Sequence, residues 1–442
     1  MQKEISYSNI FSLAWPAVFS FLGSSLIGFI DLLFVGRFGP IDIAAISLAN
    51  LFFAITSTFL DGLRTGTSIF ISKYLGSKED LKVAETIKIS FLTTMLVSIF
   101  LLLVSFPLAK LCYFFVKNPE IAKEGIVYLT LRFVAAPLYL FVFWSNGVFQ
   151  GWKITKIPMM IMGLVLVLKV IGNYIFLSWH YRLDGIAMST VLAYFIASFV
   201  YWQILVRNEE IRPFLRFREK FSSLWKEYYS MAWKLGIYAS SSLFALIIFF
   251  YMIEHMGVIA MAAHQITYQV FLLFYLPSMG FLVSVSVLAA RLRGANATSY
   301  ILPLVQRTLL LGGGIILVIG LFVIFFSHLF IGWICPGNPA VFKLASVTLK
   351  LVGISLIFQT FYLVFRGALI ALEDNGFILL AGLGCDFLFF LPTAYFFGFS
   401  LHFSVIGGYA GYLLWTLVSA MVLGWRFFSL LKKPAFGALD RA

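Results

Sequence analysis

A few ionisable side chains stand inside stretches of apolar sequence, and these residues are the first candidates for chemistry. Asp31, Asp61, Arg64 and Lys169 lie in the first half of the chain, and Asp386 lies in the second half. A charged group in the hydrocarbon of a bilayer costs at least about 2.5–3.5 kcal/mol on insertion scales, so it usually serves a function. We therefore expect ion or proton binding at some of these positions.

Asp31 is the strongest of these candidates. Ser24 lies seven residues before it on the same face of the expected helix, and the nearest cation in sequence, Arg37, is two turns away. An acid without a local counter-ion favours a titratable or ion-binding role over a structural one. Lys169 and Asn173 are one turn apart and share a face of another expected helix, where Lys169 either neutralises an acid or takes the position of a coupling ion.

A second group of polar residues forms a stripe on the expected helix around 43–72. The stripe consists of Asn50, Ser57, Asp61, Arg64 and Ser68, with spacings of three, four or seven residues. Such spacing puts them on one face of a helix that is otherwise compatible with lipid. Asp61 and Arg64 are three residues apart, which suits an ion pair, either a structural pair that neutralises itself or part of a substrate path.

The elements that carry these residues are expected to cross a bilayer. The chain has 442 residues, of which 61% are hydrophobic and 12% charged, and its mean hydropathy is +0.97. A spanning helix needs about 20 mostly apolar residues. Twelve such segments are predicted, roughly at 10–35, 43–72, 86–113, 126–151, 157–179, 185–206, 230–254, 261–290, 306–335, 345–372, 377–398 and 404–430. The sequence thus predicts an all-α polytopic membrane protein.

The chain also contains an internal repeat. Residues 11–76 align without a gap to a segment 218 positions later, with 13 identities, among them Gly62 with Gly280 and Ala14 with Ala232. Two related halves of six spans each have the same orientation and are expected to enclose a central cleft. The predicted division is an N-lobe at 1–206, a cytoplasmic linker at 207–229 and a C-lobe at 230–442.

The two copies differ in their charges. The positions equivalent to Asp31, Asp61 and Arg64 hold Phe249, Met279 and Leu282. The first lobe, more than the second, is therefore expected to carry the ion chemistry.

The formal charge of +13 is explained by orientation in the membrane rather than by nucleic acid. If the N-terminus is cytoplasmic, the inner loops and tails hold most of the cations. The central loop alone contains Arg207, Arg212, Arg216, Arg218, Lys220 and Lys226. Because cytoplasmic loops are enriched in Lys and Arg, this distribution predicts two cytoplasmic termini in a bacterial plasma (inner) membrane.

Motifs of enzymes and of metal sites are missing from the sequence. We find no phosphate-binding loop, no HExxH and no GxSxG, so neither ATP hydrolysis nor other catalysis by this chain is expected. Cys112, Cys335 and Cys385 lack the spacing of a metal site or a disulfide framework, and His264 is expected to be a packed, hydrogen-bonded residue. We predict no cofactor and no metal.

Several of these features, in their order and duplication, resemble the multidrug and toxic compound extrusion (MATE) transporters over nearly the full chain. The matching segments are Pro16 followed by Asp31–Gly36, Tyr128–Arg132 with Pro137, Asn173–Phe176, Gly185–Thr190 and Ala262–Ile266. The resemblance implies two six-helix lobes and export of amphipathic, often cationic compounds in exchange for Na⁺ or H⁺, by a protein expected to be monomeric.

The resemblance also implies positions for the functional residues. In relatives with an N-lobe site, an acid of span 1 acts with polar groups of spans 5 and 6, and these positions correspond to Asp31, Lys169, Asn173 and Thr190. Bending of span 1 at Pro16 is implied as well. The candidates for the substrate cleft are polar or charged residues inside spans, namely Ser24, Asn50, Ser57, Asp61, Arg64, Asn146 and Asp386.

This chain departs from its relatives at the ion site. Some relatives have Asn and Asp where this chain has Lys169 and Asn173, and others have acids where it has Ser242 and Gln359. Because an ammonium facing Asp31 would repel Na⁺, we hypothesise proton coupling at Asp31, with Lys169 either a tethered cation or part of a titrating pair. The alternative is a flippase for a lipid-linked saccharide, which would favour a strongly cationic cleft.

Overall fold

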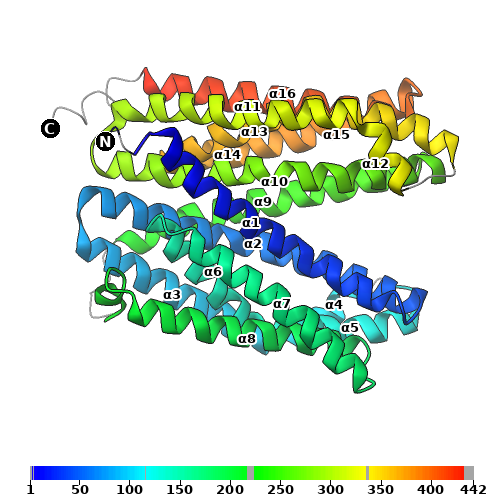
Figure 1. Ribbon diagram of the computed structural model, residues 1–442, viewed down its shortest axis with the longest axis horizontal. Helices are drawn as coiled ribbons and strands as arrows, with labels where there is room; N and C mark the ends of the chain where they lie inside the picture. Colours follow the sequence, from blue (N-terminus) through cyan, green and yellow to red (C-terminus); the bar gives the residue numbers. More distant parts are fainter. Residues whose placement is uncertain (1, 3, 115, 217–222, 335–337, 433–442) are drawn as a thin grey trace. The chain divides into compact units, whose positions relative to one another are not determined.

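The computed structural model describes residues 2, 4–114, 116–216, 223–334 and 338–432, and all regular elements within them are helices (Figure 1). In this described part, 11 helices are long and apolar enough to cross a bilayer. The bent pair α5 (Pro119–Val134) and α6 (Ala136–Gly151) together makes up to 12 spans. The prediction of an all-α polytopic membrane protein is confirmed.

The contacts divide the chain into two compact units. The first unit is 19–236, and the second unit is 1–18 together with 237–442. Helices α1 (Tyr7–Val35) and α9 (Leu224–Glu254) each continue from one unit into the other, after Val18 and after Gly236. These two positions are separated by the 218-residue spacing of the repeat. The predicted boundaries at 206 and 229 stay a prediction.

The first unit contains, besides parts of α1 and α9, a set of packed helices. They are α2 (Pro40–Ser77), α3 (Asp80–Leu103), α4 (Ser105–Cys112), α5, α6, α7 (Lys156–Ser178), α8 (Leu183–Arg207) and the short 3₁₀ helix η1 (Arg212–Arg216). Helix α2 packs against α3, α5 and α6, while α7 packs along α8. This arrangement brings α1, α5, α7 and α8 around one buried group of charged residues.

The second unit is organised around one long helix, α13 (Pro339–Ala371). It packs against α10 (Val258–Gly294), α11 (Ile301–Phe325) and α16 (Ser404–Leu431). The remaining elements are η2 (Thr298–Tyr300), α12 (Ser327–Ile334), α14 (Asn375–Leu383), α15 (Leu391–Tyr395), and the π-helical turns η3 (Gly384–Phe390) and η4 (Phe396–Ser400). The predicted span at 377–398 therefore alternates between α- and π-helical geometry.

Two predicted spans in the first unit are broken rather than continuous. The segment at 86–113 divides into α3 and α4 at Val104, and the segment at 126–151 bends by 49° between α5 and α6. Pro137, near the start of α6, explains the second break, because proline has no N–H to donate and its ring displaces the preceding turn.

The glycine shared by both copies of the repeat has the same packing role in each unit. A Cβ at Gly62 of α2 would lie 2.2 Å from the carbonyl oxygen of Ala232 in α9, and one at Gly280 of α10 would lie 2.6 Å from that of Ala14 in α1. No Cβ tolerates such a distance, so only glycine allows these helices to approach. The repeat thus preserves the contact of each second helix with the first helix of the other copy.

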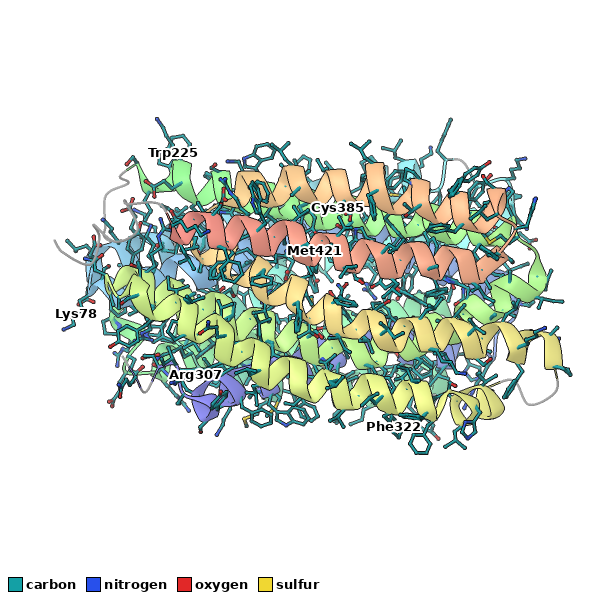
Figure 2. The ribbon with its side chains drawn as sticks, turned by 90° about the horizontal axis from the view of Figure 1, so that it is seen from above. Lys78, Trp225, Arg307, Phe322, Cys385 and Met421 are labelled. Carbon is teal, nitrogen blue, oxygen red and sulfur yellow. The ribbon has the colours of Figure 1, made fainter. Side chains whose placement is uncertain are left out.

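The surface of the described part is strongly apolar, as expected for contact with lipid. Large hydrophobic side chains project outward along the helices, including Phe322 (44% exposed) on α11 and Met421 (56% exposed) on α16 (Figure 2). Polar groups are used at the helix ends, where Arg307 donates to the carbonyl of Ile5. Arg218 and Lys220 of the predicted linker, and Cys335, lie outside the described residues.

Candidate functional site

The carboxylate of Asp31 lies in the interior of the first unit, beside Lys169. The distance from Asp31 Oδ1 to Lys169 Nζ is 2.7 Å, and both side chains are 0% exposed. Asp31 belongs to the apolar second half of α1 and Lys169 to α7, so the pair joins two helices far apart in sequence. A buried ion pair of this kind is costly to desolvate and depends on good geometry and additional hydrogen bonds.

The ammonium of Lys169 has further oxygen partners, all on α8. Lys169 Nζ donates to the carbonyl of Ile186 at 2.6 Å and to Ser189 Oγ at 2.9 Å, and it also donates to Thr190. Asn173, one turn along α7, accepts a hydrogen bond from Ser189. Together with Asp31, four oxygen atoms surround the nitrogen, and oxygen is the donor type that holds hard cations in proteins.

A tyrosine and an arginine of α5 complete the cluster from the other side. Tyr128 donates to Asp31 Oδ2 at 3.0 Å, and Arg132 Nη1 donates to the Tyr128 hydroxyl at 3.1 Å. Arg132 Nη1 is 3.6 Å from Asp31 Oδ2, and its guanidinium lies 4.2 Å from the ring centroid of Phe53. The Asp31 carboxylate is therefore the counter-ion of both Lys169 and Arg132.

The structure thus brings together Asp31, Lys169, Asn173 and Thr190, which were predicted to form a site. It adds Tyr128, Arg132 and Ser189, which were not among the predicted site residues. Arg132 could have been found by its charge within an apolar span, and Tyr128 by its position one helical turn before it. The only feature of the sequence that could have identified Ser189 as a site residue was its position next to Thr190.

Asp61 and Arg64 form a second charged group in the first unit, within α2. Arg64 Nε is 2.5 Å and Nη2 is 3.0 Å from the two carboxylate oxygens of Asp61, so the pair is bidentate. Arg64 also donates to Gln150 of α6 at 2.5 Å. The Arg64 side chain is 7% exposed and that of Asp61 is 35% exposed, so Asp61 is the more accessible partner.

The other candidates of the first unit make contacts of their own. Ser24 is exposed and donates to the carbonyl of Ser20, while Ser57 is half-buried and donates to that of Ala54. Asn146 is buried and accepts a hydrogen bond from Tyr201. Asn50 is half-buried near Gly28.

Pro16 lies within the unbroken helix α1, two residues before the boundary of the units. Its predicted role as a hinge stays a prediction.

Asp386 lies in the second unit, on the π-helical turn η3. Ser242 of α9 donates to its Oδ2 at 2.5 Å, and the Trp415 indole of α16 donates to its Oδ1 at 3.0 Å. Both donors are neutral, and the carboxylate is 2% exposed. Insertion of a π-helical turn is frequent at functional sites, because it redirects a side chain that a regular helix would place elsewhere.

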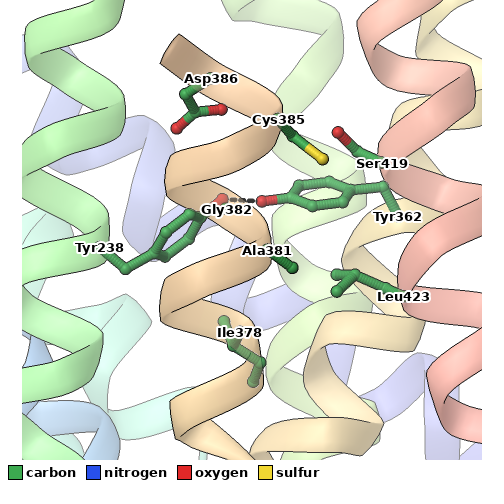
Figure 3. A pocket seen from close by; sticks show the side chains of 9 residues that line it. All are labelled: Tyr238, Tyr362, Ile378, Ala381, Gly382, Cys385, Asp386, Ser419 and Leu423. Atoms are coloured by element: carbon green, nitrogen blue, oxygen red, sulfur yellow. Dashed lines mark hydrogen bonds between the residues drawn. The ribbon is translucent and has the colours of Figure 1, made fainter. Parts of the chain in front are cut away.

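A small pocket opens beside Asp386 (Figure 3). Its lining combines aromatic, small and polar side chains: Tyr238, Tyr362, Ile378, Ala381, Gly382, Cys385, Asp386, Ser419 and Leu423. The hydroxyls of Tyr238 and Tyr362 are hydrogen-bonded to each other, and the Arg366 guanidinium lies 4.5 Å from the ring centroid of Tyr238. The pocket is therefore lined by one carboxylate and two tyrosines, of which Tyr238 already faces a guanidinium.

The sequence is similar to a known family and to known proteins. The sequence profile of the MatE family matches residues 16–175 and again 237–396, so it covers most of both copies of the repeat. Among curated proteins, the probable multidrug resistance protein NorM of Brucella suis is 24% identical over 379 residues, covering 82% of this chain and 80% of the relative. The multidrug resistance protein MdtK of Cronobacter sakazakii is 23% identical, with full coverage of both chains.

Solved structures show the same fold. A crystal structure of MATE in the bent conformation has a TM-score of 0.88 at 17% identity, covering all of this chain and 98% of the other. MATE in the straight conformation gives the same TM-score and identity, with 98% and 97% covered. A multidrug resistance MATE family transporter in an outward-facing conformation gives 0.87, with 98% and 96% covered. The likeness holds for the fold as a whole and does not favour the bent or the straight form.

Proposed function

This chain belongs to the MatE family, whose members are transporters and not enzymes, and from that premise we propose that it is a secondary active multidrug exporter. In this proposal it exchanges amphipathic, often cationic compounds for protons by alternating access. The names of NorM and MdtK describe multidrug resistance in those relatives and support export of varied compounds here. The absence of a phosphate-binding loop in the sequence supports an ion gradient as the energy source.

The single observation that carries the choice of proton over sodium is the position of the Lys169 ammonium. The Lys169 nitrogen lies 2.7 Å from Asp31 Oδ1, 2.6 Å from the carbonyl oxygen of Ile186 and 2.9 Å from Ser189 Oγ. It also donates to Thr190. A sodium ion in the same place would need those oxygens and would be repelled by the ammonium charge. A proton exchanged within the Asp31–Lys169 pair needs no additional space.

Recognition of a cationic substrate is supported by the groups around Asp386. A carboxylate attracts a cation, and the rings of Tyr362 and Trp415 add cation–π attraction, whereas the ring of Tyr238 already faces Arg366. Asp61 in the first unit, with its side chain 35% exposed, is a further acidic contact for the substrate path. Pro16 is proposed as the hinge of α1, because proline leaves one backbone carbonyl of the helix without its usual donor.

The proposal also includes the membrane in which the protein resides, its orientation and its oligomeric state. It is a multi-pass membrane protein, which we propose to reside in a bacterial plasma membrane with both termini in the cytoplasm, as a monomer. The excess of Lys and Arg in the expected inner loops supports this orientation.

The test is efflux of ethidium, a fluorescent cation, from liposomes that contain the purified protein. A pH gradient and a Na⁺ gradient are imposed separately. We expect the pH gradient to drive transport and the Na⁺ gradient to be without effect. Asp31→Asn is expected to abolish this transport, whereas Asp374→Asn, which removes an acid from a partly exposed pair with Arg426, serves as the matched control.

Transport that follows Na⁺ and ignores pH would contradict the proton proposal. Unchanged dye resistance in a deletion strain with a defective cell envelope would contradict the exporter proposal and point to a lipid flippase.

A further inference from the structure

The cluster around Asp31 holds more positive than negative charge. Asp31 contributes one negative charge, while Lys169 at 2.7 Å and Arg132 at 3.6 Å contribute one positive charge each. All three side chains are buried, with at most 10% exposed. Two further titratable groups face them, Tyr128 and Tyr194, and a phenol carries no charge in its ordinary form. The cluster therefore has a net charge of +1 when every group is in its ordinary ionised form.

Gain of a proton and loss of a proton have unequal consequences for this cluster. A proton added to Asp31 would leave two buried cations with no anion, a net charge of +2. A proton removed from Lys169 would leave Asp31 paired with Arg132 alone, a net charge of zero, with Tyr128 hydrogen-bonded between them. Because uncompensated buried charge is strongly unfavourable, the second change is the easier one. Arginine does not lose its proton in proteins, so Arg132 cannot take this role.

The surroundings of Lys169 suit both a charged and a neutral amine. An ammonium has three N–H donors, and four oxygen atoms lie around it. Two of these oxygens, of Ser189 and Thr190, are hydroxyls, which can donate as well as accept. A neutral amine can therefore keep its hydrogen bond to the carbonyl of Ile186, remain beside Asp31 and accept a hydrogen bond from a hydroxyl.

From this geometry we infer that Lys169 carries the exchanged proton, and that Asp31 remains ionised throughout the cycle as the counter-ion of Lys169 and Arg132. The inference deepens the proposed proton-coupled export and rests on it. Binding of an organic cation then favours the neutral form of Lys169 through repulsion between like charges. For a cation bound within the first unit roughly 10 Å from Lys169, the expected effect is about tenfold in affinity at an effective dielectric constant near 20.

The experiment measures ethidium binding to the purified full-length protein in detergent from pH 5.5 to 9, and proton release on binding with a pH-sensitive dye in weak buffer. The wild type is expected to bind about tenfold more tightly at high pH and to release up to one proton per ethidium. Lys169→Arg keeps the charge permanently and Lys169→Met removes it. Both are expected to bind with an affinity independent of pH and to release no proton, and Lys169→Met is expected to bind as tightly as the wild type at high pH.

The inference is overturned if either variant, shown by size-exclusion chromatography to be folded, still releases a proton as the wild type does. If Lys169→Arg does not fold, Lys169→Met decides the question alone, because Asp31 would still be present to carry a proton. A wild type that releases no proton would instead refute the proton-coupled function, and the assignment to Lys169 would fall with it.

Discussion

Replacing Asp31 by Asn leaves two buried cations without their shared counter-ion. Asp31 lies 2.7 Å from Lys169 and 3.6 Å from Arg132, and it is 0% exposed. Removal of one partner of a buried pair costs about 3–5 kcal/mol, because the remaining charge stays desolvated. We expect the Asp31→Asn protein to lose about that much free energy of unfolding in the first unit.

The loss can be measured as a fall in the thermal unfolding temperature of the purified protein in detergent. The first unit spans 19–236, and for a cooperative unit of this size 1 kcal/mol corresponds to about 2–4 °C. The expected fall is therefore on the order of 6–20 °C. It should be larger at pH 5.5 than at pH 9, because in the variant less positive charge is buried when Lys169 is neutral, so stability rises with pH.

The matched control is Lys169→Met, which removes a cation from the same pair. Asp31 then keeps Arg132 as its counter-ion and Tyr128 as a donor, so the fall in unfolding temperature should be less than half of that for Asp31→Asn. An equal or a larger fall for Lys169→Met would refute the charge count on which this reasoning depends.

Three further predictions concern other parts of the molecule. Gly62→Val is expected to lower the yield of folded protein and its unfolding temperature, because its Cβ would lie 2.2 Å from a backbone oxygen; Gly163→Ala, with nothing within 4 Å of its Cβ, should have little effect in the same thermal assay. Asp386→Asn is expected to weaken ethidium binding by at least about tenfold through loss of one attractive charge, and unchanged affinity in a fluorescence titration would remove Asp386 from the substrate site. Arg64→Gln is expected to cost about 1–3 kcal/mol of stability by leaving Asp61 and Gln150 without their donor, while the pH dependence of transport, measured in liposomes, stays that of the wild type.

The fold could be predicted from sequence because each span is an independent apolar segment. The internal repeat and the family resemblance, which is now confirmed, fixed their number and order. Breaks within spans were harder to predict. Pro137 signals the bend between α5 and α6, and Pro107, three residues after Val104, signals the break between α3 and α4 in the same way. Pro392 follows the π-helical turn that holds Asp386, but a proline alone does not predict π-helical geometry.

For the candidate site, too, contacts within one helix could be predicted from the sequence, but contacts between helices could not. The pair of Asp61 with Arg64 follows from spacing within one helix, whereas Gln150 reaches Arg64 from 86 residues away. Likewise, Arg132 meets Asp31 only through the packing of α5 against other helices. Local periodicity does not determine which helices become neighbours, so these partners required the structure.

The two helices that belong to both units impose an order on biogenesis. The first unit needs only residues up to Gly236, so it can be completed while the chain is still being synthesised. Residues 1–18 leave the ribosome before the first unit does, yet they pack against a part of the chain that is made after it: Ser284 donates to the carbonyl of Ile10, and Arg307 to that of Ile5. The N-terminal end of α1 must therefore remain without its native partners until α10 and α11 have been inserted. A nascent chain that stalls between the two halves would expose this segment to chaperones and proteases.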